Sequence, residues 1–144
     1  MKTKTTVTEI THDDIVNLFQ YLYSSDYFIV SYDTTPLKEK PECFEDCIAE
    51  LLLMGKSIKV GDMYADDETC FFGDNPHKYL ENEGVMWYKI NLNTIKKGLA
   101  KAMSDETSFV QQSASHLMTE PGSLDYWECD ALLQTIVFGK LIYG

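Results

Sequence analysis

The segment 124–138, LDYWECDALLQTIVF, most strongly constrains how this chain can fold. Its spacing predicts a helix, and apolar side chains cover more than half of the circumference of that helix. The main apolar face holds six side chains: Tyr126, Cys129, Leu132, Leu133, Ile136 and Val137. A second apolar stripe on a different side holds Trp127, Ala131 and Phe138. A helix with two apolar sides needs packing partners on both of them.

Two interpretations of the second stripe remain open. Two layers of the fold can cover the helix from both sides, which is the simpler interpretation. Alternatively, the stripe is an interface with a second copy of the chain or with another protein. Because Trp and Phe are favoured anchors of protein interfaces, Trp127 and Phe138 are candidate partner-binding residues.

Other segments carry helix or strand signals. Helical spacing of apolar residues predicts further helices at 12–23, 42–55, 93–103 and 105–118. The predicted capping residues are Thr11, Asn93 and Asp125 at helix starts, and Gly55 and Gly139 at helix ends. Strands are predicted at 27–33, 56–65 and 85–92, with 68–73 as a hairpin partner of 56–65. The segment 75–84 is expected to be a loop or a short helix.

The order of these elements predicts an α+β fold. Strands gather in the middle of the chain and helices gather in its last third, which favours a small antiparallel sheet of three to four strands covered by about five helices. The chain has 144 residues, of which 44% are hydrophobic, so it can build a core. We expect a single globular domain over 1–144, because no repeat or long linker divides the sequence.

The charge of the chain excludes some classes of partner. The formal net charge is −11, and all 12 basic residues are lysines. Arginine supplies the planar fork that binds phosphate, carboxylate and guanine in a bidentate manner. A chain without arginine is therefore a poor candidate for phosphoryl transfer or sequence-specific DNA reading. The negative charge also opposes approach to nucleic acid, so a nucleic-acid partner is not expected.

An acidic segment, VGDMYADDETCFFGDN, occupies residues 60–75 and contains no cation. Its carboxylates near 65–67 fit a solvated turn between two strands, and as a surface they suit a basic partner, so Asp66, Asp67 and Glu68 are candidate partner-binding residues. Alternatively, the carboxylates of 62–74 bind a divalent metal for a hydrolase or nuclease. The spacing does not match an EF-hand loop, and we predict no metal site.

Asp62 differs from the other acidic residues of this segment. It shares a strand face with Ile58 and Val60, which are expected to face the core. A buried carboxylate needs a partner, and lysine and histidine are the cationic types in this chain that could provide one.

The cysteine and histidine residues give weak signals. Cys43 and Cys47 lie at i and i+4 on an apolar helix face, where buried packing explains them better than zinc binding. His116 and Glu120 could form an acid/base pair, but a surface histidine near a helix end is the simpler interpretation. We predict no catalytic residue and no cofactor, because no known catalytic motif is present.

Two segments resemble a group of known sequences. The ending DALLQTIVFGKLIYG and the middle LLLMGKSIKVGDMYAD resemble short proteins of unknown function encoded by phages and mobile elements of gut bacteria. The shared pattern is LLQ, three variable residues, FG, three more and YG, which is apolar and glycine-based and therefore structural. The resemblance implies no activity. It implies a small acidic protein of the kind that interacts with host systems.

Together these features predict a non-catalytic, acidic protein-interaction module that binds a host protein or associates with itself as a dimer. The alternative is the metal-dependent hydrolase or nuclease described above. No apolar run approaches the roughly 20 residues of a membrane span. The first residues, MKTKTTVTEI, lack the apolar region of a signal peptide. We therefore expect a cytoplasmic protein with no membrane partner.

Overall fold

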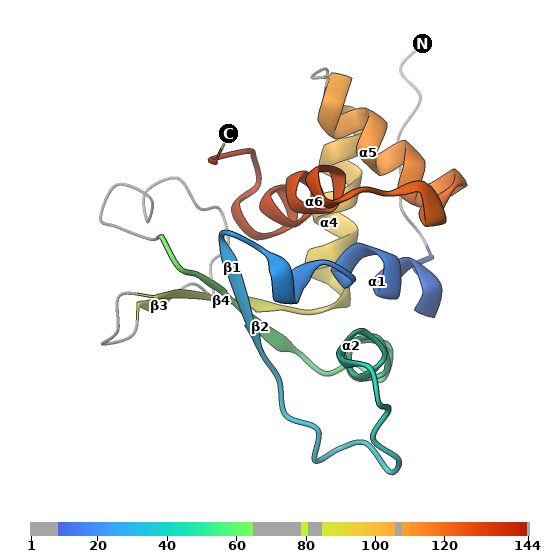
Figure 1. Cartoon of the computed structure of the whole chain (residues 1–144), viewed down its shortest axis with the longest axis vertical. Helices are drawn as coiled ribbons and strands as arrows, with labels where there is room; N and C mark the ends of the chain where they lie inside the picture. Colours follow the sequence, from blue (N-terminus) through green and yellow to red (C-terminus); the bar gives the residue numbers. More distant parts are fainter. Residues whose placement is uncertain (1–8, 65–78, 81–84, 106–107, 144) are drawn as a thin grey trace.

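The fold is α+β, as predicted. A computed structural model describes residues 9–64, 79–80, 85–105 and 108–143. Within these residues a four-stranded antiparallel sheet lies beside five α-helices, with the helices gathered to one side (Figure 1). The strands are β1 (Phe28–Ser31), β2 (Ile58–Asp62), β3 (Tyr79–Leu80) and β4 (Met86–Ile90). The helices are α1 (His12–Phe19), α2 (Phe44–Leu53), α4 (Leu92–Ser104), α5 (Ser108–Thr119) and α6 (Tyr126–Phe138), with short 3-10 turns η1 (Leu22–Ser24) and η2 (Pro121–Ser123).

Local capping signals place most helix ends. The Thr11 hydroxyl accepts a hydrogen bond from the backbone N–H of Asp14, whose carboxylate accepts one from the N–H of Thr11. Gly139 ends α6 with φ +83°, a conformation that favours glycine. The prediction that Asn93 caps α4 is wrong, because Asn91 has the extended backbone of an N-cap and accepts a hydrogen bond from Thr94 N–H at 2.9 Å.

The strand order is β1-β2-β4-β3, so β2 lies between β1 and β4. Part of the segment expected to be a loop or short helix is a strand, since β3 pairs with β4 at Tyr79↔Trp87 and Leu80↔Met86. The predicted hairpin strand at 68–73 lies outside the described residues. The predicted strands 27–33, 56–65 and 85–92 correspond to β1, β2 and β4.

One face of the sheet packs against the helices. Side chains alternate along β2 and β4, and the buried set on this face is Phe28, Ile58, Val60, Asp62, Met86, Tyr88 and Ile90. On the opposite face Gly61 leaves room for its neighbours. A Cβ atom there would lie 2.8 Å from Val85 Cγ1 and 2.9 Å from Ile29 Cγ1.

Helix α6 lies in the middle of the helical layer and contacts α1, α4 and α5 (Figure 1). It meets α4 very closely at Gly98, where a Cβ atom would lie 2.5 Å from Ile136 Cα. Every residue of α6 from Glu128 to Phe138 is buried. None of the described helices is long and apolar enough to cross a membrane.

The burial of α6 overturns part of the predicted partner surface. Phe138 is fully buried, and its ring packs 5.7 Å from Phe28 and 5.3 Å from Tyr88, measured between ring centroids. Ala131 is buried as well. Phe138 therefore cannot present its side chain to a partner, and two layers of the fold cover this part of the second stripe. Of the stripe residues, Trp127 alone remains exposed.

Candidate functional site

Of the two predicted site residues that the structure describes, Trp127 and Phe138, Trp127 is the accessible one. Its side chain is 58% exposed in the first turn of α6. Tyr126 turns inward toward Tyr21, and Glu128 turns toward α5, so the intervening residue faces outward. The Trp127 ring meets the Tyr126 ring edge-on at a centroid distance of 5.1 Å, which supports the indole from one side.

Acidic residues from two parts of the chain belong to the surroundings of the first turn of α6. Asp125 is the exposed N-cap residue of α6 and accepts a hydrogen bond from Glu128 N–H at 2.8 Å. Asp26, also exposed, precedes β1, and its backbone N–H donates to the Tyr126 hydroxyl oxygen at 2.8 Å. Burial raises the pKa of the Tyr126 hydroxyl, and the hydrogen bond from Asp26 opposes that rise. Trp127 therefore lies in a helix turn whose neighbouring residues bear or contact acidic residues: Asp125 precedes it by two positions, and Tyr126 is bound by the backbone of Asp26.

A third carboxylate, Asp130, lies one turn further along α6 and is buried, with 8% of its surface exposed. Its Oδ2 accepts a hydrogen bond from Gln134 Nε2 at 2.8 Å. Within the described part of the chain, its Oδ1 has no hydrogen-bond partner. Burial raises the pKa of Asp130, the hydrogen bond from Gln134 opposes the rise, and the charge of Asp26 adds to it.

The other end of α6 is closed by the segment that follows it. Gln134 Oε1 accepts hydrogen bonds from the backbone N–H groups of Ile142 and Tyr143, both at 2.8 Å. Its Nε2 donates to the carbonyl oxygen of Tyr143 at 3.2 Å. A single buried amide thus holds the end of the segment 140–143 against the helix, and the Tyr143 ring meets the stripe residue Phe138 at a centroid distance of 6.0 Å.

Tyr143 also provides a partner for the carboxylate of Asp62. Asp62 is fully buried on the helix side of β2, and the Tyr143 hydroxyl donates to its Oδ1 at 2.8 Å and to its Oδ2 at 2.7 Å. The Tyr143 ring stacks on Tyr27 at a centroid distance of 4.6 Å. Asp62 lies on the buried strand face with Ile58 and Val60, and its partners include this phenol, whereas the sequence reasoning sought a partner among cationic side chains. Asp66, Asp67 and Glu68 lie outside the described residues.

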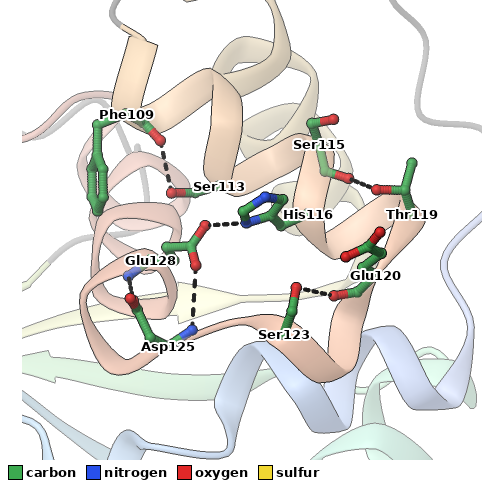
Figure 2. A network of polar contacts seen from close by, with 9 residues as sticks. All are labelled: Phe109, Ser113, Ser115, His116, Thr119, Glu120, Ser123, Asp125 and Glu128. Carbon is green, nitrogen blue, oxygen red and sulfur yellow. Dashed lines mark hydrogen bonds and ion pairs between the residues drawn. The ribbon is translucent and has the colours of Figure 1, made fainter.

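His116 pairs with Glu128 and not with Glu120, the residue considered as the alternative acid/base partner in the sequence. Its Nδ1 lies 2.6 Å from Glu128 Oε2, and Figure 2 shows this contact linking α5 to the capping box of Asp125 and Glu128. Glu120 instead donates its backbone N–H to the His116 carbonyl oxygen at 2.7 Å. Among the described residues no serine, threonine or cysteine side chain hydrogen-bonds to the His116 ring. The pair therefore has the geometry of a helix–helix link and lacks an adjacent nucleophile.

The cysteines are mostly packing residues. Cys47 and Cys129 are buried, and Cys129 Sγ donates to the Asn17 carbonyl oxygen at 3.3 Å. Burial raises the pKa of Cys129 to about 12, so its thiol stays protonated. Cys43 is exposed, contrary to prediction, because it is the N-cap residue of α2 and lies outside the helix face. In the described ranges, no three His, Cys, Asp or Glu side chains are placed to hold a metal ion.

Sequence reasoning found Trp127 but missed its neighbours. Asp130 carried a detectable signal, because it is an acid on a helix predicted to be apolar on more than half its circumference. Asp26 and Tyr126 are 100 residues apart, so no local pattern could have joined them. No protein-family model, curated protein or solved structure matches this chain. The role of Trp127 and its neighbours is therefore inferred from their own chemistry.

Proposed function

We propose that this protein is a non-catalytic interaction module, and that Trp127 with Asp125 and Asp26 binds a positively charged segment of a partner protein. The exposure of Trp127 on an otherwise buried helix carries the proposal. Tryptophan is a frequent anchor of protein interfaces, and a cation over its ring gains about 0.5–1 kcal/mol at an exposed site. Flanking carboxylates add attraction for the same cation and repel anions.

The overall charge favours a cationic partner. A net charge of −11 attracts basic proteins over a distance of about 8–10 Å at physiological salt and speeds their association. The resemblance to mobile-element proteins suggests a host protein as this partner and the cytoplasm as the place of action. A symmetric dimer through the same surface is the alternative. It would bring the Asp125 and Asp26 carboxylates of the two copies together, which disfavours it.

A displayed library of random peptides tests the proposal, because it offers the surface many cationic and non-cationic sequences at once. The immobilised protein should enrich peptides rich in lysine or arginine, and Trp127→Ala should lose about tenfold or more in affinity for them. The matched control is Tyr64→Ala, because Tyr64 is an aromatic residue of similar exposure, 60%, just after β2. Equal binding by the wild type and the Trp127→Ala variant would refute the proposed surface.

Light scattering tests the dimer. A dimer through the acidic surface should strengthen at high salt, which screens the repulsion between copies, and should disappear in Trp127→Ala. A mass that stays monomeric at every salt concentration would remove self-association and leave the cationic partner.

A further inference from the structure

A small cavity lies beside Asp130 and Tyr126, the residue that precedes Trp127 in α6. It is lined by Tyr21, Ser25, Tyr126, Cys129 and Asp130, among others, and its volume is about 10 Å³. A cavity of this volume holds one group of the size of a water molecule. It brings together η1, the segment before β1, and the first turns of α6.

The cavity contains an acceptor that lacks a donor. Asp130 Oδ1 is buried and has no hydrogen-bond partner in the part of the chain that the structure describes. A buried carboxylate oxygen without a donor is strongly unfavourable, because it has lost its hydration without gaining a replacement. A ligand that donates hydrogen bonds at this position would remove that cost.

Two of the hydroxyl groups that line the cavity, those of Ser25 and Tyr126, already accept hydrogen bonds. Ser25 Oγ accepts from two backbone N–H groups around the start of β1, at 3.2 Å and 3.0 Å, so both of its lone pairs are used. The Tyr126 oxygen accepts from Asp26 N–H at 2.8 Å, and the Ser25 side chain hydrogen-bonds to it as well. Asp130 Oδ1 is the buried carboxylate oxygen of this lining that lacks a donor among the described residues, so a ligand at this position must offer it one.

The charge and the shape of the cavity restrict the chemical class of the ligand further. Asp26 and Asp130 place two carboxylates near the cavity, which excludes anions and favours a cation. Tyr21 and Tyr126 both line the cavity, and the face of an aromatic ring attracts ammonium groups. A primary ammonium has three N–H donors and the size of water, whereas a planar guanidinium is too large for this volume.

We propose that Asp130 Oδ1, in the cavity that Tyr21 and Tyr126 also line, binds a primary ammonium group, that of a lysine side chain in the partner segment. The identity of the partner rests on the proposed function, but the ammonium site itself does not. Trp127 then covers the aliphatic part of the lysine while the cavity takes its charged end. The site would therefore select lysine over arginine.

Methylammonium chloride is a suitable probe, because it carries the same charged group as lysine. Thermal unfolding is measured in methylammonium, tetramethylammonium and sodium chloride at equal ionic strength. Tetramethylammonium has no N–H donor and is too large for the cavity. Methylammonium alone should raise the Tm saturably, by about 2–4 °C near saturation. Equal Tm values in the three salts would overturn the proposal and indicate that the cavity holds water.

Two variants and one carbon resonance show whether the methylammonium effect acts through Asp130. Asp130→Asn should abolish the methylammonium effect, and Asp13→Asn, which removes one exposed charge from α1, should keep it. In the wild-type protein, methylammonium should also shift the carboxyl carbon resonance of Asp130, so the test does not depend on a variant that folds. An effect that persists in Asp130→Asn, or an Asp130 resonance that does not move, would overturn the proposal.

The two proposals can fail separately. If methylammonium acts through Asp130 but no peptide binds through Trp127, the ammonium site is supported and the interaction surface is refuted. If peptides bind through Trp127 but prefer arginine and ignore Asp130→Asn, the surface is supported and the ammonium site is refuted.

Discussion

The two ends of α6 show what covers an apolar helix and what leaves it open. At its C-terminal end Phe138 packs between Phe28 and Tyr88, and Gln134 holds the segment 140–143 against the helix. At its N-terminal end Trp127 is exposed near a buried carboxylate oxygen that lacks a donor among the described residues. The same helix thus supports the core at one end and offers an accessible surface at the other. Substitutions at the two ends should therefore differ in how far they affect folding and binding.

The largest effect is expected at the closed end. Phe138→Ala removes a fully buried ring and should lower the free energy of unfolding by about 3–5 kcal/mol, measured by urea denaturation. The matched control is Phe109→Ala, since Phe109 is 41% exposed in α5 and should cost much less. A loss below about 1 kcal/mol for Phe138→Ala would contradict the burial of this end.

A smaller loss is expected where the terminal segment meets the sheet. Tyr143→Phe removes the hydroxyl that donates to both oxygens of Asp62, a fully buried carboxylate. The substitution should lower the free energy of unfolding by about 1–3 kcal/mol. Tyr64→Phe removes a hydroxyl from an exposed ring and serves as the control. If both variants unfold at the same urea concentration as the wild type, the hydroxyl of Tyr143 does not stabilise Asp62.

The buried carboxylate at the open end should make stability depend on pH. Because the folded-state pKa of Asp130 is raised above its unfolded value of about 3.9, folding takes up a proton in the interval between the two values. The contribution of Asp130 therefore becomes less favourable as pH rises through this interval, by at most about 1.4 kcal/mol per pH unit.

Asp130→Asn removes this titration, so the variant should gain stability relative to the wild type as pH rises from about 4 and then reach a constant difference. Urea denaturation at a series of pH values measures the difference, with Asp13→Asn as the control for loss of an exposed acid. A difference between Asp130→Asn and the wild type that does not change with pH would show that Asp130 titrates normally.

The outcome of the sequence predictions follows the same contrast between local and distant contacts. The capping boxes of Thr11 with Asp14 and Asp125 with Glu128 span three residues, so their signals are readable in the sequence. The alternation along β2 correctly placed Asp62 in the core. Its contact with Tyr143 spans 81 residues, and no periodic pattern encodes such a pair.

The candidate site was only partly predictable for the same reason. A helical wheel placed Trp127 and Phe138 on one stripe, but it carries no information about which neighbours cover each end. Tyr88 of the sheet and Tyr143 of the segment held by Gln134 both pack against Phe138. The cavity needs Ser25 and Asp130 side by side, which depends on how η1 packs against α6.

Trp127→Ala should have the smallest effect on stability, within about 0.5 kcal/mol of the wild type, because the side chain is 58% exposed. Circular dichroism should follow the urea denaturation, since the substitution removes a fluorophore. A near-zero cost together with a large loss of peptide binding would mean that Trp127 serves recognition and not folding. If Trp127→Ala lowers the free energy of unfolding by more than about 2 kcal/mol, Trp127 belongs to the core. Both ends of α6 would then be covered by the same kind of packing.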